Sequence, residues 1–99
     1  MATVTETYIL EQDEGKTTYP SAARARIETA LSSGAIVSFT KTPIVAGSDL
    51  VVGKTRSNVV IVYRSADDRN TFKRATKADK ELQAYIISSN STIINRTVS

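Results

Sequence analysis

The sequence predicts an α+β fold in which an antiparallel sheet carries two helices on one face. Short runs of β-branched and aromatic residues alternate with two helical patterns, and the elements follow the order β-α-β-(β)-β-α-β. Without the doubtful short strand in parentheses, this order is the split βαβ arrangement. The 99 residues suffice for a single hydrophobic core. We therefore expect residues 1–99 to form a single small domain.

The first part of the chain predicts a strand followed by a helix. Residues 3–10 are rich in Thr, Val, Tyr and Ile, which favour a strand, and a charged turn follows in which Gly15 can adopt a positive φ. Residues 22–33 predict a helix, because their apolar positions recur at helical spacing. Pro20 suits the first turn of this helix, and Gly34 stands where a helix commonly ends.

The middle and the end of the chain predict further strands, one of them doubtful. Residues 35–42 favour a strand, and Pro43 must lie at its end or on an edge of the sheet. Residues 50–52 can form a short strand between two glycines. Residues 58–64 are apolar on both faces, which predicts a central strand covered on both sides. Residues 92–98 are β-prone and predict a last strand or a terminal arm.

Between these strands, residues 65–89 predict one continuous helix. Ser65 is a suitable N-cap, and two acids follow in the first turn, where they interact favourably with the helix dipole. A competing interpretation has a turn at 66–70, a strand at 71–75 and a helix capped by Thr76. We prefer the continuous helix, because a helical wheel gathers six apolar residues on one side. These residues are Phe72, Ala75, Ala78, Leu82, Tyr85 and Ile86.

The opposite face of the same helix is basic and is the candidate binding surface. Four cations lie along it at helical spacing, and two arginines lie nearby. Such a balance favours an acidic partner, either a nucleic-acid backbone or an acidic protein surface. The alternative is a solvated helix face without a partner. The candidate binding residues are Arg64, Arg69, Lys73, Arg74, Lys77 and Lys80.

Both ends of the chain have sequences that favour self-association. Each is strand-like and lacks the clustered charges that protect an exposed sheet edge, so each can add a strand to a neighbouring subunit. The alternative is that the two strands pair within the domain. The candidate oligomer contacts are Val4, Tyr8, Ile93, Ile94 and Val98.

The composition argues against an enzyme, a metal site and a bound cofactor. His and Cys are absent, which removes the commonest general base, the thiolate nucleophile and the commonest metal ligands. Residues 47–55 resemble a phosphate-binding loop, but the glycines are too far apart by one residue and a strand follows. The acids Glu11, Asp13 and Glu14 lack the spacing of a calcium loop.

Together these observations predict a small non-enzymatic protein that associates with itself, such as a structural or accessory protein of a bacteriophage virion. A nucleic-acid-binding regulator that uses the basic helix over 66–89 is one alternative, and an inhibitor or adaptor docking on an acidic protein is another. An RNA-recognition module is not expected, because its paired aromatics and glycine signature are missing. No signal peptide or membrane-length apolar run is visible, so we expect no membrane contact and a location in the host cytoplasm or the virion.

Overall fold

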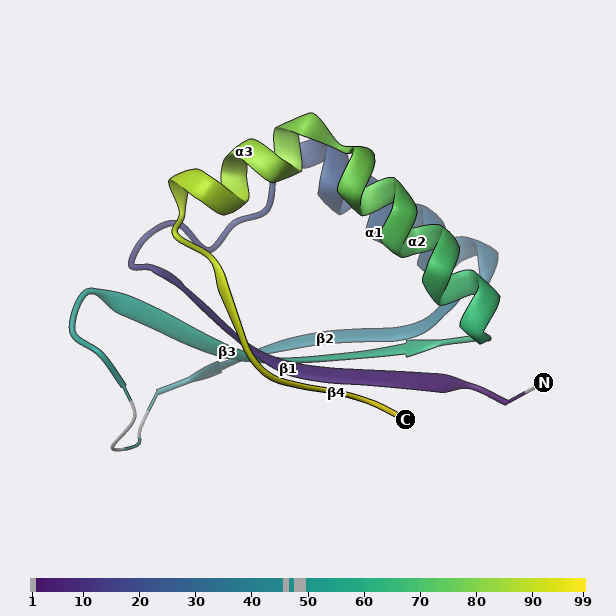
Figure 1. Cartoon of the computed structure of the whole chain (residues 1–99), viewed down its shortest axis with the longest axis horizontal. Coiled ribbons are helices and arrows are strands. Elements are labelled where there is room, and N and C mark those ends of the chain that lie inside the picture. Colours follow the sequence, from purple (N-terminus) through teal and green to yellow (C-terminus); the bar gives the residue numbers. More distant parts are fainter. Residues whose placement is uncertain (1, 46, 48–49) are drawn as a thin grey trace.

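The computed structural model describes residues 2–45, 47 and 50–99 and confirms the α+β class. The strands form one antiparallel sheet in the order β2-β3-β1-β4, and the helices lie together over one face of it (Figure 1). The elements along the chain are β1 (Val4–Asp13), α1 (Ser21–Ser33), β2 (Ile36–Ile44), β3 (Lys54–Tyr63), α2 (Ala66–Ala78), α3 (Lys80–Ser88) and β4 (Thr92–Val98).

The core lies between the sheet and the helices. Alternate residues of the central strands β1 and β3 point to this side, and the antiparallel register places Tyr8 opposite Val59. The buried cluster includes residues from the three strands β1, β2 and β3. Its members are Tyr8, Leu10, Ile36, Val59, Ile61 and Tyr63.

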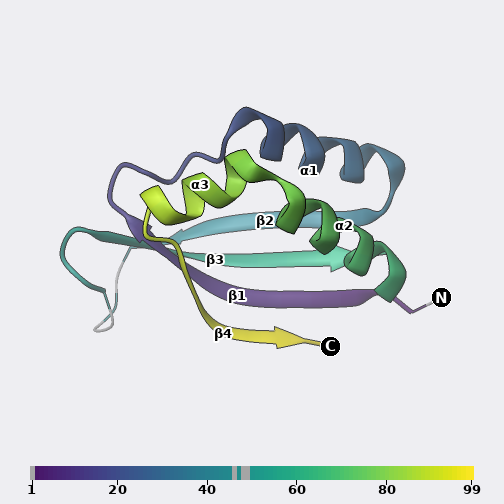
Figure 2. The ribbon, with the colours of Figure 1, turned by 45° about the horizontal axis from the view of Figure 1, so that its top comes forward.

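Figure 2 looks onto the helix side of the sheet. The opposite face carries no helix or strand from the described part of the chain (Figure 1). Val60 and Val62 of β3 lie on this side, where both are half-buried. The expectation that this strand is covered on both faces is therefore wrong for the single chain. Each helical connection joins two parallel strands that have one antiparallel strand between them. Right-handed connections of this kind place their helices on the same face of a sheet.

Several predicted boundaries shift, mostly because strand pairing extends past the residues with high β-propensity. β1 continues through the predicted turn to Asp13, and Gly15 follows with the expected positive φ of 80°. Pro43 lies near the end of β2 at an edge of the sheet, as predicted. The short strand over 50–52 is wrong, because the Lys54 N–H donates to the carbonyl of Val51 at 3.1 Å and closes a turn instead.

The first helix ends where the sequence predicts it to end. Gly34 has a left-handed φ of 84°, and its N–H donates to the Leu31 carbonyl. The continuous helix over 65–89 is only partly right. Ser65 caps the N-terminus of α2 by accepting from the N–H of Asp68, as predicted, but the helix ends at Ala78. The competing turn and strand over 66–75 are wrong, because α2 covers that segment.

Asp79 separates α2 from α3. Its backbone is extended, with ψ at 103°, and its carboxylate accepts the Leu82 N–H at 3.1 Å as the N-cap of α3. The same carboxylate pairs with Arg26 of α1. A short acidic side chain that bonds to the following turn competes with helix continuation, so one residue both ends α2 and starts α3.

This arrangement predicts a specific acid sensitivity, because the hydrogen bond from Arg26 holds the pKa of Asp79 below its usual 3.8. A lowered native pKa contributes stability that is complete above pH 3.8 and is lost as the pH falls through the native value. Asp79→Asn should therefore lose less unfolding free energy between pH 5 and pH 3 than the wild type loses. Urea denaturation at both pH values measures this, with Asp67→Asn as the control at an exposed acid. Equal losses in the wild type and Asp79→Asn would contradict the prediction.

Candidate functional site

The structure divides the predicted basic surface into cations that pair with acids and cations that do not. Arg69 and Lys73 of α2 point toward β1, where the side chain of Glu6 is fully buried. The distances to the Glu6 carboxylate are 3.2 Å from Arg69 Nε and 3.0 Å from Lys73 Nζ, and Arg96 of β4 approaches it at 3.1 Å. The prediction that Lys73 faces solvent is therefore wrong. A buried carboxylate needs counter-charges, and these three cations supply them.

This cluster changes how Lys73 can be used as a probe of binding. Burial lowers the pKa of Lys73, whereas its contact with Glu6 acts in the opposite direction. Reversing its charge would place a second carboxylate beside Glu6. Such a change would damage the fold, so Lys73→Glu does not report on a partner.

Arg64 is also paired, although its side chain is 55% exposed. It donates from Nε and Nη2 to the two carboxylate oxygens of Asp68, at 2.9 and 3.0 Å, four residues further along the chain. This contact lowers the pKa of Asp68. The pair connects the end of β3 to the first turn of α2, so the charge of Arg64 stabilises a contact within the domain.

Three of the predicted cations remain for a partner. Arg74, Lys77 and Lys80 are exposed, and within the described residues none of them forms an ion pair. Arg74 and Lys77 belong to α2, and Lys80 begins α3. The predicted surface of six cations is therefore a smaller patch of three, which we call the outer cations.

The structure assigns different roles to the two terminal strands. β1 is central and pairs with β3 on one side and β4 on the other, so it has no free edge for a second chain. Val4 and Tyr8 pack in or against the core on the helix side. The expectation that this segment adds a strand to another subunit is therefore wrong. The alternative, in which both strands pair within the domain, is what the structure has, because β1 pairs with β3 and β4.

β4 does lie at an edge, but it has features that oppose strand addition. Its register against β1 shifts, and Asn95 has a left-handed φ of 54°, which marks a bulge. Arg96 follows, with its guanidinium directed to Glu6. Bulges and inward-pointing charges are common protections of sheet edges. Of the predicted contacts in β4, Ile93 and Val98 are exposed, and Ile94 lies half-buried opposite Ile9 on the uncovered face.

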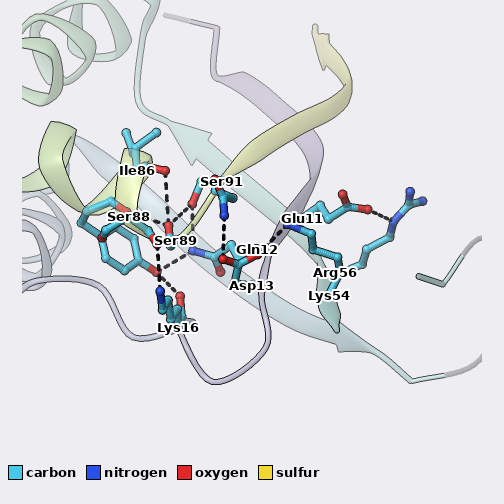
Figure 3. Close-up of polar contacts among 12 residues, drawn as sticks. Glu11, Gln12, Asp13, Lys16, Lys54, Arg56, Ile86, Ser88, Ser89 and Ser91 are labelled. Atoms are coloured by element: carbon cyan, nitrogen blue, oxygen red, sulfur yellow. Dashed lines mark hydrogen bonds and ion pairs between the residues drawn. The ribbon is translucent and has the colours of Figure 1, made fainter. Parts of the chain in front are cut away.

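The uncovered face of the sheet, which we call the open face, is largely β-branched and almost neutral. Its charged residues, among those described, lie at one end as the cross-strand pairs Glu11–Arg56 and Asp13–Lys54, with distances of 2.8 and 2.5 Å (Figure 3). Both ion pairs join β1 to β3, so these four charges are balanced within the sheet. The central part of the open face consists of Thr5, Thr7, Ile9, Ser38, Thr40, Asn58, Val60, Val62, Ile94 and Thr97.

On the opposite side of the sheet, a cavity of about 280 Å³ lies beneath the helices. Aromatic and aliphatic side chains form most of its wall, and Lys73, Lys77 and Arg96 border it. The sequence pattern did not indicate this cavity, because the predicted continuous helix has no bend at Asp79. A helical wheel also describes one element at a time and gives no distance between helix and sheet.

A polar network ties β1 to the connection between α3 and β4, near the same cavity. Gln12 is buried, and its Nε2 donates to the Tyr85 hydroxyl at 2.5 Å and to Ser91 Oγ at 3.2 Å. Ser89 and Ser91 share a short hydroxyl contact of 2.6 Å beside it (Figure 3). The hydroxyl of Tyr85 in turn donates to the Lys16 carbonyl at 2.8 Å. Buried polar groups in this region are thus paired with one another and serve the fold.

Within the part of the chain that the structure describes, no three His, Cys, Asp or Glu side chains gather as a metal site. Two of the acids weighed for a cation, Glu11 and Asp13, are engaged in the ion pairs of the open face. Among the described helices, none has the length and apolar character required to cross a bilayer. Comparisons with protein-family models, curated proteins and solved structures give no match for this chain.

Proposed function

We propose that this chain is a non-enzymatic structural or accessory protein that associates with a second copy of itself through the open face. The observation that carries the proposal is an uncovered sheet face with Ile9, Val60, Val62 and Ile94 near its centre. Strands with apolar residues on both sides are typical of sheets that are covered on both sides. A second sheet stacked face to face would supply the missing cover.

A second copy fits this face better than a charged partner does. The chain has a net charge of +3, so two copies carry a mild overall electrostatic repulsion. The open face avoids this repulsion, because its charges are already paired and its centre is neutral. In a two-fold symmetric dimer the same patch meets itself, and a neutral β-branched patch is compatible with that geometry.

The size of the open face also suits a dimer. Its two central strands have ten residues each. At about 3.3 Å per residue and about 4.8 Å between strands, the four-stranded face covers about 600 Å². Stable interfaces bury about 800 Å² per partner, so the open face with its rim approaches that range.

Association through the open face leaves the helix side accessible. The outer cations Arg74, Lys77 and Lys80 would then face away from the dimer contact, toward nucleic acid or an acidic neighbour in a larger assembly. A bacteriophage virion or the host cytoplasm is the proposed setting. That setting is supported by composition alone: no His or Cys, and many Ser and Thr.

The test is a single charge placed in the centre of the open face. Val60 lies opposite Thr7 of β1 and Thr40 of β2, so Val60→Glu would bury two carboxylates in a symmetric dimer. We expect gel filtration with light scattering to give a dimer mass for the wild type and a monomer mass for Val60→Glu. Val52→Glu is the matched control, because Val52 is fully exposed in a loop, and it should stay dimeric.

Thr7→Arg provides a second variant on the same face in case Val60→Glu folds poorly, which circular dichroism would reveal. It should also give monomers, because two arginines would meet across the interface. A wild type that stays monomeric at high micromolar concentration would overturn the proposal. So would a dimer that persists in both folded variants.

A further inference from the structure

The cavity under the helices has the properties of a small-molecule site and is separate from the open face. Its floor includes Leu10 and Ile61 of the sheet, its roof includes Phe72 and Leu82 of the helices, and Tyr19 also lines it. Apolar cavity walls of this kind can bind apolar groups. Ligand sites commonly combine an apolar wall with a few polar groups at defined places.

The bend between α2 and α3 makes room for this space. The two helices meet at an angle above the sheet, with the bend at Asp79 (Figure 1). Arg26 holds that bend from α1 through its ion pair with Asp79, and it lines the cavity as well. The ion pair between Arg26 and Asp79 therefore fixes the position of the helices above the cavity.

The exposure of the lining residues locates the mouth of the cavity. Lys77 of α2 and Ile93 and Arg96 of β4 are exposed, whereas the floor residues are buried. The mouth therefore opens between α2 and β4. The mouth of the cavity is positively charged. A single carboxylate, that of Glu6, is shared by three cations, which are Arg69, Lys73 and Arg96. Lys77 adds a further positive charge and has no ion pair among the described residues.

We propose that this cavity binds a medium-chain carboxylate, with its hydrocarbon chain inside and its carboxylate at the mouth near Lys77 and Arg96. The apolar wall matches the chain, and the excess positive charge matches the head group. An apolar cavity of about 150 Å³ holds benzene, which has six carbons. The present volume of about 280 Å³ therefore suits a chain of about ten carbons.

Isothermal titration calorimetry with decanoate tests this proposal on the full chain. We expect saturable binding at one molecule per chain, with decanol binding at least tenfold more weakly because it lacks the charge. Lys77→Glu should weaken decanoate binding about tenfold, since it replaces an attraction at the mouth by a repulsion. Lys80→Glu is the matched control, because Lys80 is exposed and does not line the cavity, and its affinity should stay within twofold.

A second variant tests the cavity itself. Ala23 of α1 is buried and lines the cavity, so Ala23→Leu should fill part of it and abolish decanoate binding. Circular dichroism checks that this variant folds, and Lys77→Glu remains informative if it does not. The proposal is overturned if decanoate fails to saturate, if decanol binds as tightly, or if Lys77→Glu and Lys80→Glu give equal affinities. None of these outcomes depends on the dimer, which uses the other face of the sheet.

Discussion

Glu6→Gln is expected to destabilise the protein by about 3–5 kcal/mol, the range seen when one partner of a buried ion pair is removed. The substitution keeps the size of the side chain and removes its charge. Arg69, Lys73 and Arg96 would then face a neutral amide in place of a carboxylate that is fully buried. Their mutual repulsion would no longer be offset, and the three cations are only 22% to 42% exposed.

Equilibrium denaturation in urea measures this effect, and Glu28→Gln is the matched control. Glu28 is exposed on α1 and has no ion pair among the described residues, so its loss should change the unfolding free energy by less than about 0.5 kcal/mol. A double-mutant cycle with Lys73→Met adds a sharper criterion. Lys73→Met should cost less in the Glu6→Gln background than alone, because the lysine there has lost its partner. Additive costs would show that the two side chains do not interact.

Ile36→Ala is expected to cost about 2–5 kcal/mol, the range for truncating a buried aliphatic side chain. Ile36 starts β2 opposite Tyr63 and is 1% exposed. Removing its side chain leaves a void against the end of β3, and a packed strand pair closes such a void only in part. The effect belongs to the core and not to the ligand cavity, which Ile36 does not line.

Ile87→Ala makes the same chemical change at a position where it should matter little. Ile87 lies on α3 and is 77% exposed, so its truncation removes little buried area, and alanine favours the helix slightly. Urea denaturation should separate the two variants by at least about 2 kcal/mol. A similar cost at both positions would contradict the burial described for Ile36.

Local patterns in the sequence determined the elements of this protein and their class. Residues 92–98 predicted a strand with the observed bounds, and Gly34 predicted the end of α1 through its left-handed backbone. Ser65 predicted the start of α2, because its side chain can accept a hydrogen bond from the first turn of a helix. These signals act within a few residues, so they can be recognised without knowing what packs nearby.

The tertiary structure alone decided how those elements use their charges. A helical wheel places Arg69 and Lys73 with Lys77 and Lys80 on one basic face, but it says nothing about Glu6, which is more than sixty residues away along the chain. The pairing arises because β1 lies in the centre of the sheet, beneath α2. Asp79 is similar, since its partner Arg26 comes from another helix. Contacts between residues distant in sequence therefore decided that Arg69 and Lys73 are engaged within the domain, and hence which part of the helix can meet a partner.

The two proposed sites also differ in how far the sequence alone could predict them. The open face follows from the continuous apolar run within residues 58–64, which places apolar side chains on both sides of the strand. Only the structure showed that the described part of the chain leaves one of these sides uncovered. The cavity has no such local signal, because its size depends on the distance between the bent α2–α3 pair and the sheet. Side-chain periodicity is a property of a single element, whereas a cavity is a property of the space between elements.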